Sequence, residues 1–446
     1  MNKLITSRFG RLNSFWHNIE EFRQSDKHLR DLRTQKYVYT SPWLDEVVHP
    51  GVYLFFGGRQ VGKTTSLKQC ILRALEEKKV LPEATFYLPC DTLVDRTELE
   101  EILRGFIEEV PKEQLSLLVI DEITFINQWQ LTVKGLIDQG LFEKTILLIT
   151  GSDRVVLEDA ASGFPGIHRR GRYGKDFIIH PLTFHEYCNL VSKEKEHTEN
   201  LDGLFLTYLQ TGGYLPAINA VAMEGSISDQ LYAVYEQWIV GDIVRKGKDR
   251  RRFTDLLRVL HQSYGSQLSY SGIAQKAQHL STDTVIEYVD YLERLGFLIV
   301  LQAFDQNTLS AFPKKDKRIY VRDPFLLSVM EHFLLQQGVI AERERVVESY
   351  RVETAVIGCF EANNNKLYYI KAEGEVDLVE VHQGTFTAIE VKWTEQLRNA
   401  DLKQILKYPK EGIILAKNPK VKEVEGVQVR GLVEYLRELT PKAHAK

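Results

Sequence analysis

The sequence has few cysteines and no long apolar run. Its four cysteines lie far apart and match neither a zinc-ligand spacing nor a disulfide framework; they are Cys70, Cys90, Cys188 and Cys359. No stretch of about 18 consecutive apolar residues occurs, and the first residues lack the apolar core of a signal peptide. We therefore expect no disulfide scaffold and no membrane partner, and we expect a cytoplasmic location.

An excess of basic charge is also missing. The chain has 57 lysines and arginines against 61 acidic residues, a formal net charge of −4, so any nucleic-acid site must be a local patch. Hydrophobic residues (43%) and charged residues (26%) have near-average shares, which argues against long disordered tracts. At 446 residues the chain is too long for one ordinary core, and we expect roughly two to four domains.

The alternation of apolar and polar segments predicts the first two parts of the chain. Residues 1–45 are polar and aromatic, without a strong apolar stripe, and are expected to be an N-terminal extension that packs on the neighbouring domain. Short apolar runs then alternate with stretches long enough for helices; they cover residues 52–56, 84–88, 115–120 and 145–150. This pattern is typical of a parallel sheet buried on both faces and predicts an α/β domain over residues 46–195.

A phosphate-binding loop follows the first of these runs. Its letters fit G-x-x-x-x-G-K-[ST] between a strand and a helix, and with the next threonine the predicted ATP contacts are Gly57, Gly58, Arg59, Gln60, Val61, Gly62, Lys63, Thr64 and Thr65. The glycines let backbone N–H groups surround phosphate oxygens, Lys63 reaches the outer phosphates, and Thr64 is a ligand of Mg2+. The motif therefore predicts ATP and Mg2+ as cofactors.

The strand ends downstream of this loop carry the expected catalytic groups. The run 115–120 ends in Asp121, which would bind the water shell of Mg2+, and Glu122, which would polarise the attacking water. The run 145–150 is followed by Ser152, which could sense the γ-phosphate or simply belong to a strand-terminating turn. Arg172, in a cluster with Arg169 and Arg170, is the expected arginine finger, and a solvated basic surface is the alternative.

The middle of the chain reads as helical. Residues 196–252 are expected to form a helical lid, and residues 253–335 a winged helix whose third helix begins near Ser281 or Thr282 and ends at Gly296. The densest basic run covers residues 245–252, and further basic residues near the expected wing are Lys314, Lys315, Lys317 and Arg318. Such clusters bind DNA phosphates without reading sequence, although many are only solvated surface. Glu287 in the third helix argues against sequence-specific reading.

Taken together, these motifs resemble a known family. The chain is similar to the prokaryotic AAA-type ATPases, related to archaeal ATPases, that carry a C-terminal nuclease-like domain. The resemblance covers nearly everything after about residue 35 and rests on residues 58–65, 121–123, 150–152, 171–173, 181–186 and 212–216. It implies an α/β fold class: a P-loop AAA-type parallel sheet with helical lid, winged helix, and a C-terminal α/β restriction-endonuclease-like domain over residues 336–446. Gly58 stands where the family often has proline.

The C-terminal part resembles the PD-(D/E)xK nuclease superfamily through residues 375–378 and 389–393. The resemblance implies that Asp377 and Glu390 hold Mg2+ or Mn2+ against a phosphodiester, and that Lys392 orients or activates water. Glu353 resembles the additional acid that the superfamily places on a preceding helix. We call Glu353, Asp377, Glu390 and Lys392 the acidic constellation. Gln404 and Tyr408, expected on a following helix, match a Q-x-x-x-Y element of RecB-like nucleases. A surface salt bridge would give the same letters.

The hairpin between these strands has a predictable register. An even-length turn centred on Gln383 and Gly384 places Asp377 opposite Glu390 and Glu375 opposite Lys392. Two opposed carboxylates repel each other, and a divalent cation between them would turn that repulsion into coordination.

The sequence therefore predicts an ATP-hydrolysing enzyme that couples a P-loop ATPase to a metal-dependent DNA nuclease-like domain. One alternative is a nucleotide-switched DNA- or protein-binding regulator whose nuclease fold is inactive. Another is a signalling ATPase with a protein partner and no nucleic acid. The form of DNA, the pathway and the oligomeric state, a homo-oligomer included, stay open.

Overall fold

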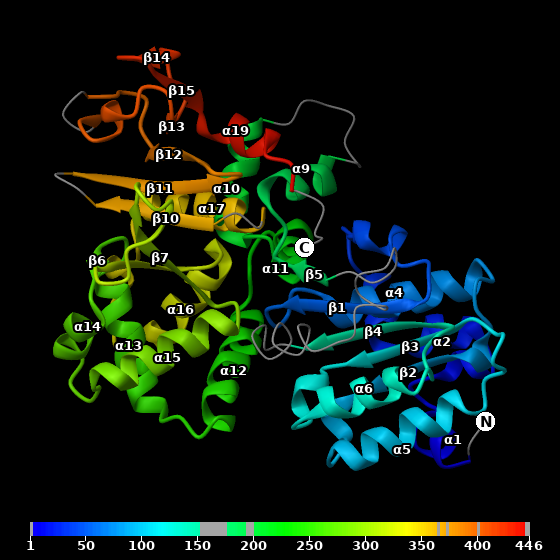
Figure 1. Ribbon diagram of the computed structural model, residues 1–446. Coiled ribbons are helices and arrows are strands. Elements are labelled where there is room, and N and C mark those ends of the chain that lie inside the picture. Colours follow the sequence, from blue (N-terminus) through cyan, green and yellow to red (C-terminus); the bar gives the residue numbers. More distant parts are fainter. Residues whose placement is uncertain are drawn as a thin grey trace. The chain divides into compact units, whose positions relative to one another are not determined.

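The chain folds into two compact units, the first extending to His180 and the second beginning at Pro181 (Figure 1). The computed structural model describes residues 3–151, 176–192, 200–363, 366–371, 374–398 and 402–441. Within these ranges, no helix has both the length and the apolar character needed to cross a membrane.

The first unit is built on a five-stranded parallel sheet. Its strands are β1 (Gly51–Gly57), β2 (Thr85–Pro89), β3 (Ser116–Asp121), β4 (Thr145–Gly151) and β5 (Asp176–Ile179), in the order β2-β3-β4-β1-β5. Alternate residues of β1 enter different core clusters, Leu54 and Phe56 one and Tyr53 and Phe55 the other, so both faces of the sheet are buried. The predicted parallel sheet is confirmed, and β5 is a strand that the apolar runs did not indicate.

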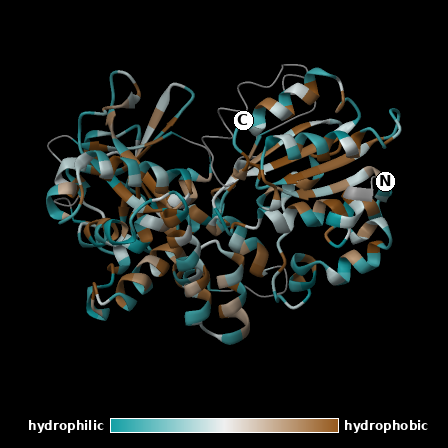
Figure 2. Ribbon diagram, turned by 90° about the horizontal axis from the view of Figure 1, so that it is seen from below, coloured by the Kyte–Doolittle hydropathy of each residue, from teal (hydrophilic) through white to brown (hydrophobic). Residues whose placement is uncertain are grey.

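Helices cover this sheet, and the hydrophobic residues concentrate on the strands and on inward helix faces (Figure 2). The helices between the strands are α4 (Lys63–Glu76), α5 (Arg96–Ile107) and α6 (Trp129–Asp138). The N-terminal residues form α1 (Lys3–Phe9), α2 (Ile19–Ser25) and α3 (Lys27–Leu32). Phe15, Phe22 and Leu29 belong to the same core cluster as Leu67 of α4, so the N-terminal segment is part of the first unit.

The second unit begins with helices. They are α9 (Phe184–Ser192), α10 (Leu201–Thr211), α11 (Leu215–Glu224), α12 (Asp229–Arg245), α13 (Arg250–Gln262), α14 (Tyr270–Lys276) and α15 (Thr282–Arg294). Ser281 caps the start of α15 and Gly296 adopts a positive φ just after its end, as predicted. A hairpin of β7 (Leu298–Asp305) and β9 (Lys317–Val321) follows α15. The winged-helix assignment itself stays a prediction.

One mixed sheet runs through the rest of this unit, in the order β14-β15-β13-β12-β11-β10-β7-β9-β6. Its other strands are β6 (Gln267–Leu268), β10 (Lys366–Lys371), β11 (Glu375–His382), β12 (Thr385–Lys392), β13 (Gly412–Ala416), β14 (Glu423–Val424) and β15 (Val427–Gly431); β8 (Ser310–Ala311) pairs with β7. Helices α16 (Pro324–Gln336), α17 (Glu348–Glu361) and α19 (Leu432–Glu438) complete the unit. Parallel pairing of Tyr368 with Gln302 joins segments that the sequence assigned to separate domains.

The β11–β12 hairpin has the predicted register. Gln383 and Gly384 both adopt positive φ, as in a two-residue type I′ turn, and the pairs run from His382 with Thr385 to Leu378 with Ile389. The β11–β12 pairing ends with Leu378 and Ile389, so it does not extend to the expected pairs of Asp377 with Glu390 and of Glu375 with Lys392. Those two pairs stay predictions.

Candidate functional site

The phosphate-binding loop joins β1 to α4. Gly57 ends β1 where an added Cβ would lie 2.5 Å from the carbonyl oxygen of Ile179, so packing of β5 requires glycine there. Gln60 and Gly62 adopt positive φ within the loop, and Gly62 is the N-cap of α4. This backbone path turns the chain directly into the helix N-terminus, where oriented N–H groups attract anions. Lys63, Thr64 and Thr65 follow in the first turn of α4, as the motif requires.

Lys63 is folded back onto the loop. Its Nζ donates to the carbonyl oxygens of Gly57 (2.9 Å) and Gly58 (2.8 Å) and lies 3.8 Å from Glu122 Oε1. The side chain is buried. A buried ammonium held by carbonyls at the loop is placed to meet the outer phosphates of a nucleotide.

Asp121 accepts three side-chain hydrogen bonds at the end of β3. Its Oδ2 accepts from Thr64 Oγ1 and from Tyr87 OH, both at 2.8 Å, and its Oδ1 accepts from Thr150 Oγ1 at 2.5 Å. Thr64 and Asp121, which the sequence predicted as Mg2+ ligands, thus lie side by side. The contacts of Tyr87 and Thr150 were missed, although both residues lie near the ends of predicted strands adjacent to β3.

Glu122 occupies the turn after β3. Its φ of 54° lies in the left-handed region, and its backbone N–H donates to Thr150 Oγ1 at 2.9 Å. Its buried Oε2 has no hydrogen-bond partner among the described residues. A carboxylate oxygen without a protein partner beside Lys63 is available to accept a proton from water.

A buried lysine links the N-terminal segment to this site. Lys68 Nζ lies 3.2 Å from Asp26 Oδ2 and 3.2 Å from the ring centroid of Tyr87. Burial lowers the pKa of Lys68 to about 8, and Asp26 opposes that shift. His28 Nδ1 lies 3.3 Å from Thr65 Oγ1. Asp26 and His28 both come from the segment before β1, which no sequence motif connected to the predicted nucleotide site.

Some predicted residues lie outside the described part of the chain. These are Ser152 and the cluster Arg169, Arg170 and Arg172. Arg59, by contrast, is described, and its guanidinium lies 5.9 Å from the ring centroid of Phe125.

The acidic constellation gathers in the second unit from three elements, with Glu353 on α17, Asp377 on β11, and Glu390 and Lys392 on β12. Lys392 Nζ lies 2.6 Å from Glu390 Oε1, and Asp377 Oδ2 accepts from the Val391 N–H at 2.9 Å. Glu390 is 5% exposed, and its Oε2 is buried with no hydrogen-bond partner among the described residues.

Arg318, which we expected near an exposed wing, lies instead in this constellation and is 3% exposed. Its guanidinium donates to Asp377 Oδ1 at 3.0 Å and to Glu353 Oε2 at 3.1 Å. Tyr320 OH donates to the same Glu353 oxygen at 2.7 Å. Residues two apart in a strand point to the same face. The spacing of Arg318 and Tyr320 could therefore have indicated that both side chains lie on one buried face of β9.

Burial makes the charged forms of these acids unfavourable. It raises the pKa of Glu353 to about 7 and that of Glu390 to about 8, and in both cases the charge of Asp377 adds to the shift. Arg318 counteracts the shift at Glu353, and Lys392 counteracts it at Glu390.

The metal expected here does not fit this arrangement. In the described ranges, no three or more His, Cys, Asp or Glu side chains are grouped so that they could hold a metal ion. Arg318 already engages the oxygens of Asp377 and Glu353 that a divalent cation would use. The Mg2+ that the sequence predicts near Thr64 and Asp121 is a different case, because Mg2+ needs only one or two carboxylates beside nucleotide phosphates.

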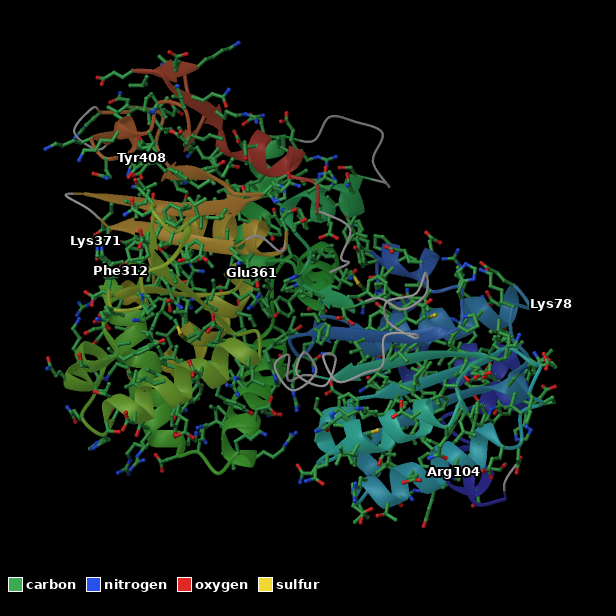
Figure 3. All side chains as sticks on the ribbon, viewed as in Figure 1. Lys78, Arg104, Phe312, Glu361, Lys371 and Tyr408 are labelled. Carbon is green, nitrogen blue, oxygen red and sulfur yellow. The ribbon has the colours of Figure 1, made fainter. Side chains whose placement is uncertain are left out.

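The Q-x-x-x-Y element is also arranged differently from the expectation. Gln404 and Tyr408 flank a short 3-10 turn (Ile405–Lys407) and do not share an α-helix. Pro409 explains why Tyr408 is not helical, because the residue before a proline is disfavoured in the helical conformation. Tyr408, labelled in Figure 3, accepts a hydrogen bond from Gln306.

The basic residues near α13 divide into two kinds. Lys248 is engaged with Glu287, at 2.5 Å, and lies 4.7 Å from the ring centroid of Tyr288. Arg250, Arg251 and Arg252 are exposed in the first turn of α13. This triplet is therefore accessible to a polyanion.

Comparison with known proteins identifies the first unit. Residues 49–188 match the family described as an AAA domain, and residues 202–337 match a domain family of unknown function. The chain is 26% identical over 283 residues to an uncharacterized protein of Methanocaldococcus jannaschii, and this match covers 56% of either protein. It thus spans about half the length of that relative. Together with the loop and the sheet, the first match assigns an AAA-type P-loop ATPase domain.

Solved structures of low identity also align. The Orc1 protein of Aeropyrum pernix, solved in complex with DNA, is 13% identical, with 65% of this chain and 89% of that chain covered and a TM-score of 0.35. AMPPCP-bound DnaA from Aquifex aeolicus is 14% identical, with 56% and 85% covered and a TM-score of 0.31.

Proposed function

We propose that the chain binds ATP with Mg2+ at residues 57–65 and hydrolyses it. The observation that carries this proposal is the convergence of Lys63, Thr64, Asp121 and Glu122 at the N-terminus of α4, with Thr64 bonded to Asp121 at 2.8 Å. These four side chains supply the charge, the metal ligands and the base that phosphoryl transfer to water needs.

Each residue has a distinct role in the proposed reaction. Lys63 exchanges its loop carbonyls for the outer phosphate oxygens and stabilises the charge that develops there. Thr64 and Asp121 would hold Mg2+, which would neutralise phosphate charge. Glu122 accepts the proton of the attacking water through its unpartnered oxygen. Arg172 and Ser152 are proposed as the arginine finger and the γ-phosphate sensor.

Two substitutions test this proposal. Lys63→Ala should reduce ATP turnover by at least about a hundredfold, since it removes the charge at the transferred phosphate. Glu122→Gln should keep nucleotide binding and lose turnover to a similar degree, since an amide is not a base. Titration with a fluorescent ATP analogue separates binding from turnover. If Glu122→Gln hydrolysed ATP at the wild-type rate, the assignment of the base would be wrong.

We propose that the second unit is a DNA nuclease-like domain. In the described arrangement, Arg318 is bound to two carboxylates of its acidic constellation. The pairing of Lys392 with Glu390 and the unpartnered Oε2 of Glu390 support this relation to nucleases. The exposed residues Arg250, Arg251 and Arg252 are the proposed DNA contact, through phosphates. The alternative is a nucleotide-switched regulator whose nuclease fold is permanently inactive. A cytoplasmic location and a homo-oligomeric assembly also remain proposals.

A further inference from the structure

Arg318 contacts the acidic constellation, and its side chain is more deeply buried than any charged side chain of the constellation itself. It comes from β9, while the carboxylates that it bridges come from β11 and α17. Besides Asp377 and Glu353, its Nη2 and Nε donate to the carbonyl oxygen of Gly265 at 2.9 and 3.1 Å. All three guanidinium nitrogens thus have partners, and the fork geometry of arginine suits such bridging.

Three of the carboxylate oxygens that a metal would require already accept hydrogen bonds. Asp377 Oδ1 accepts from Arg318, and Asp377 Oδ2 accepts from Val391. Glu353 Oε2 accepts from both Arg318 and Tyr320. Within the acidic constellation, Glu390 Oε2 is buried without a partner among the described residues, and Mg2+ or Mn2+ prefers about six oxygen ligands.

We propose that Arg318 is the resident cation of the acidic constellation and that it excludes divalent metal from this site. The inference rests on the proposed nuclease-like function and adds how that site is regulated. Arginine stays protonated at any physiological pH, so titration of this side chain does not open the site. Metal binding instead requires Arg318 to leave its two carboxylates. When it leaves, the buried acids lose their compensating charge, and a divalent cation is the natural replacement.

The test uses the full chain without nucleotide and Mn2+ as the probe. Arg318→Gln removes the charge but keeps a polar side chain of similar length. Arg322→Gln is the matched control, because Arg322 directly follows β9, has a side chain that is only 12% exposed, and is paired with Glu361 outside the constellation. Binding is measured by electron paramagnetic resonance of free Mn2+, and melting temperature is measured with and without the metal.

We expect Arg318→Gln to gain one Mn2+ site at least about tenfold tighter than any site of the wild type, which corresponds to about 1.4 kcal/mol. Its melting temperature should rise with Mn2+, whereas that of Arg322→Gln should not. Adding Asp377→Asn to Arg318→Gln should abolish the gain. Arg318→Lys keeps one charge without the fork, so its Mn2+ affinity should lie between those of wild type and Arg318→Gln.

Two outcomes would overturn the inference, and they can be distinguished. If the wild type binds Mn2+ as tightly as Arg318→Gln, and Asp377→Asn removes binding from both, the metal site stands and the exclusion by Arg318 does not. If neither protein binds Mn2+ and both are folded, the nuclease-like proposal fails together with the inference. Should Arg318→Gln be unfolded without metal, recovery of folded protein with Mn2+ supports the inference, and no recovery counts against it.

Discussion

The side-chain amide of Asn13 pairs with both backbone groups of Tyr87. Asn13 Nδ2 donates to the Tyr87 carbonyl at 3.0 Å, and its Oδ1 accepts from the Tyr87 N–H at 2.7 Å. Because β2 is an edge strand of the ATPase sheet, this fully buried amide takes the place of a neighbouring strand. Tyr87 OH in turn donates to Asp121, so one residue connects the N-terminal segment to the proposed Mg2+ ligand.

Tyr87→Phe should weaken Mg2+ use in ATP hydrolysis. The substitution keeps the ring beside Lys68 and the pairing with Asn13, but it removes the hydroxyl that orients Asp121. Loss of such an outer-sphere partner reduces metal affinity or activity by roughly tenfold or more. We expect the Mg2+ concentration for half-maximal turnover to rise by about that factor. Steady-state ATPase assays at varied Mg2+ measure it.

Tyr53→Phe is the control for that experiment. Tyr53 is buried in the same unit, but its hydroxyl donates to the carbonyl of His49, away from Asp121. Its substitution should leave the Mg2+ dependence unchanged. An equal shift for both variants would mean that the loss of a buried hydroxyl, and not its position on Asp121, is responsible.

Asn13→Leu should destabilise the ATPase unit. It leaves the N–H and carbonyl of Tyr87 buried without partners, and each such group costs about 1–3 kcal/mol. We expect a loss of about 2–4 kcal/mol in the free energy of unfolding, measured by urea denaturation. Asn18→Ala, which removes the exposed N-cap of α2, should cost only about 1 kcal/mol. Similar losses for the two variants would contradict the role of Asn13.

Local patterns predicted local structure well in this chain. The apolar runs correspond to β1 through β4, and the turn at Gln383 and Gly384 fixed the hairpin register. The site at Asp121 was predicted only in part. Tyr87 contacts Asp121 from a neighbouring strand, and no motif in the sequence indicates which residues of neighbouring strands come into contact. Arg318 was placed at the surface because neighbouring lysines share its charge; its burial depends on acids 35 and 59 residues away.

Gly212 and Gly213 are also explained by contacts with residues far away in the sequence. An added Cβ on Gly212 would lie 1.7 Å from Asp323 Oδ1, and one on Gly213 would lie 2.1 Å from the carbonyl oxygen of Leu182. Asp323 caps α16, where its carboxylate accepts from the Phe325 N–H at 2.8 Å and from the Gly213 N–H at 2.9 Å. Close approach of the backbone to this buried acid therefore requires glycine.

Asp323 should make the second unit less stable as pH rises. Burial raises its pKa from 3.8 to about 7, so the folded state holds a proton that the unfolded state has released. This contribution to stability is fully present below about pH 4 and is lost as pH rises through about 7. Between pH 5 and 8 the wild type should lose on the order of 1–3 kcal/mol that Asp323→Asn does not lose.

Urea unfolding of the wild type and of Asp323→Asn, at the lower and the higher pH of that range, measures the difference in their loss of stability. Asp249→Asn is the control, because Asp249 caps α13 by the same kind of hydrogen bond but is exposed. Its pH dependence should follow that of the wild type. If the stability of Asp323→Asn changed with pH as much as that of the wild type, the buried carboxyl would not be the source of the pH dependence.

Reversing the charge of Arg250, Arg251 and Arg252 to glutamate should weaken DNA binding and reduce its dependence on salt. Removal of each phosphate contact should lower the slope of log K against log salt by roughly 0.9. Fluorescence anisotropy with a labelled duplex, over a range of NaCl concentrations, gives that slope. Lys410, Lys420 and Lys422 are exposed in the same unit, so their reversal to glutamate changes the net charge by the same amount and controls for it. If both sets of variants change the slope equally, or neither changes it, the arginine triplet is solvated surface and the proposal of a DNA contact there is wrong.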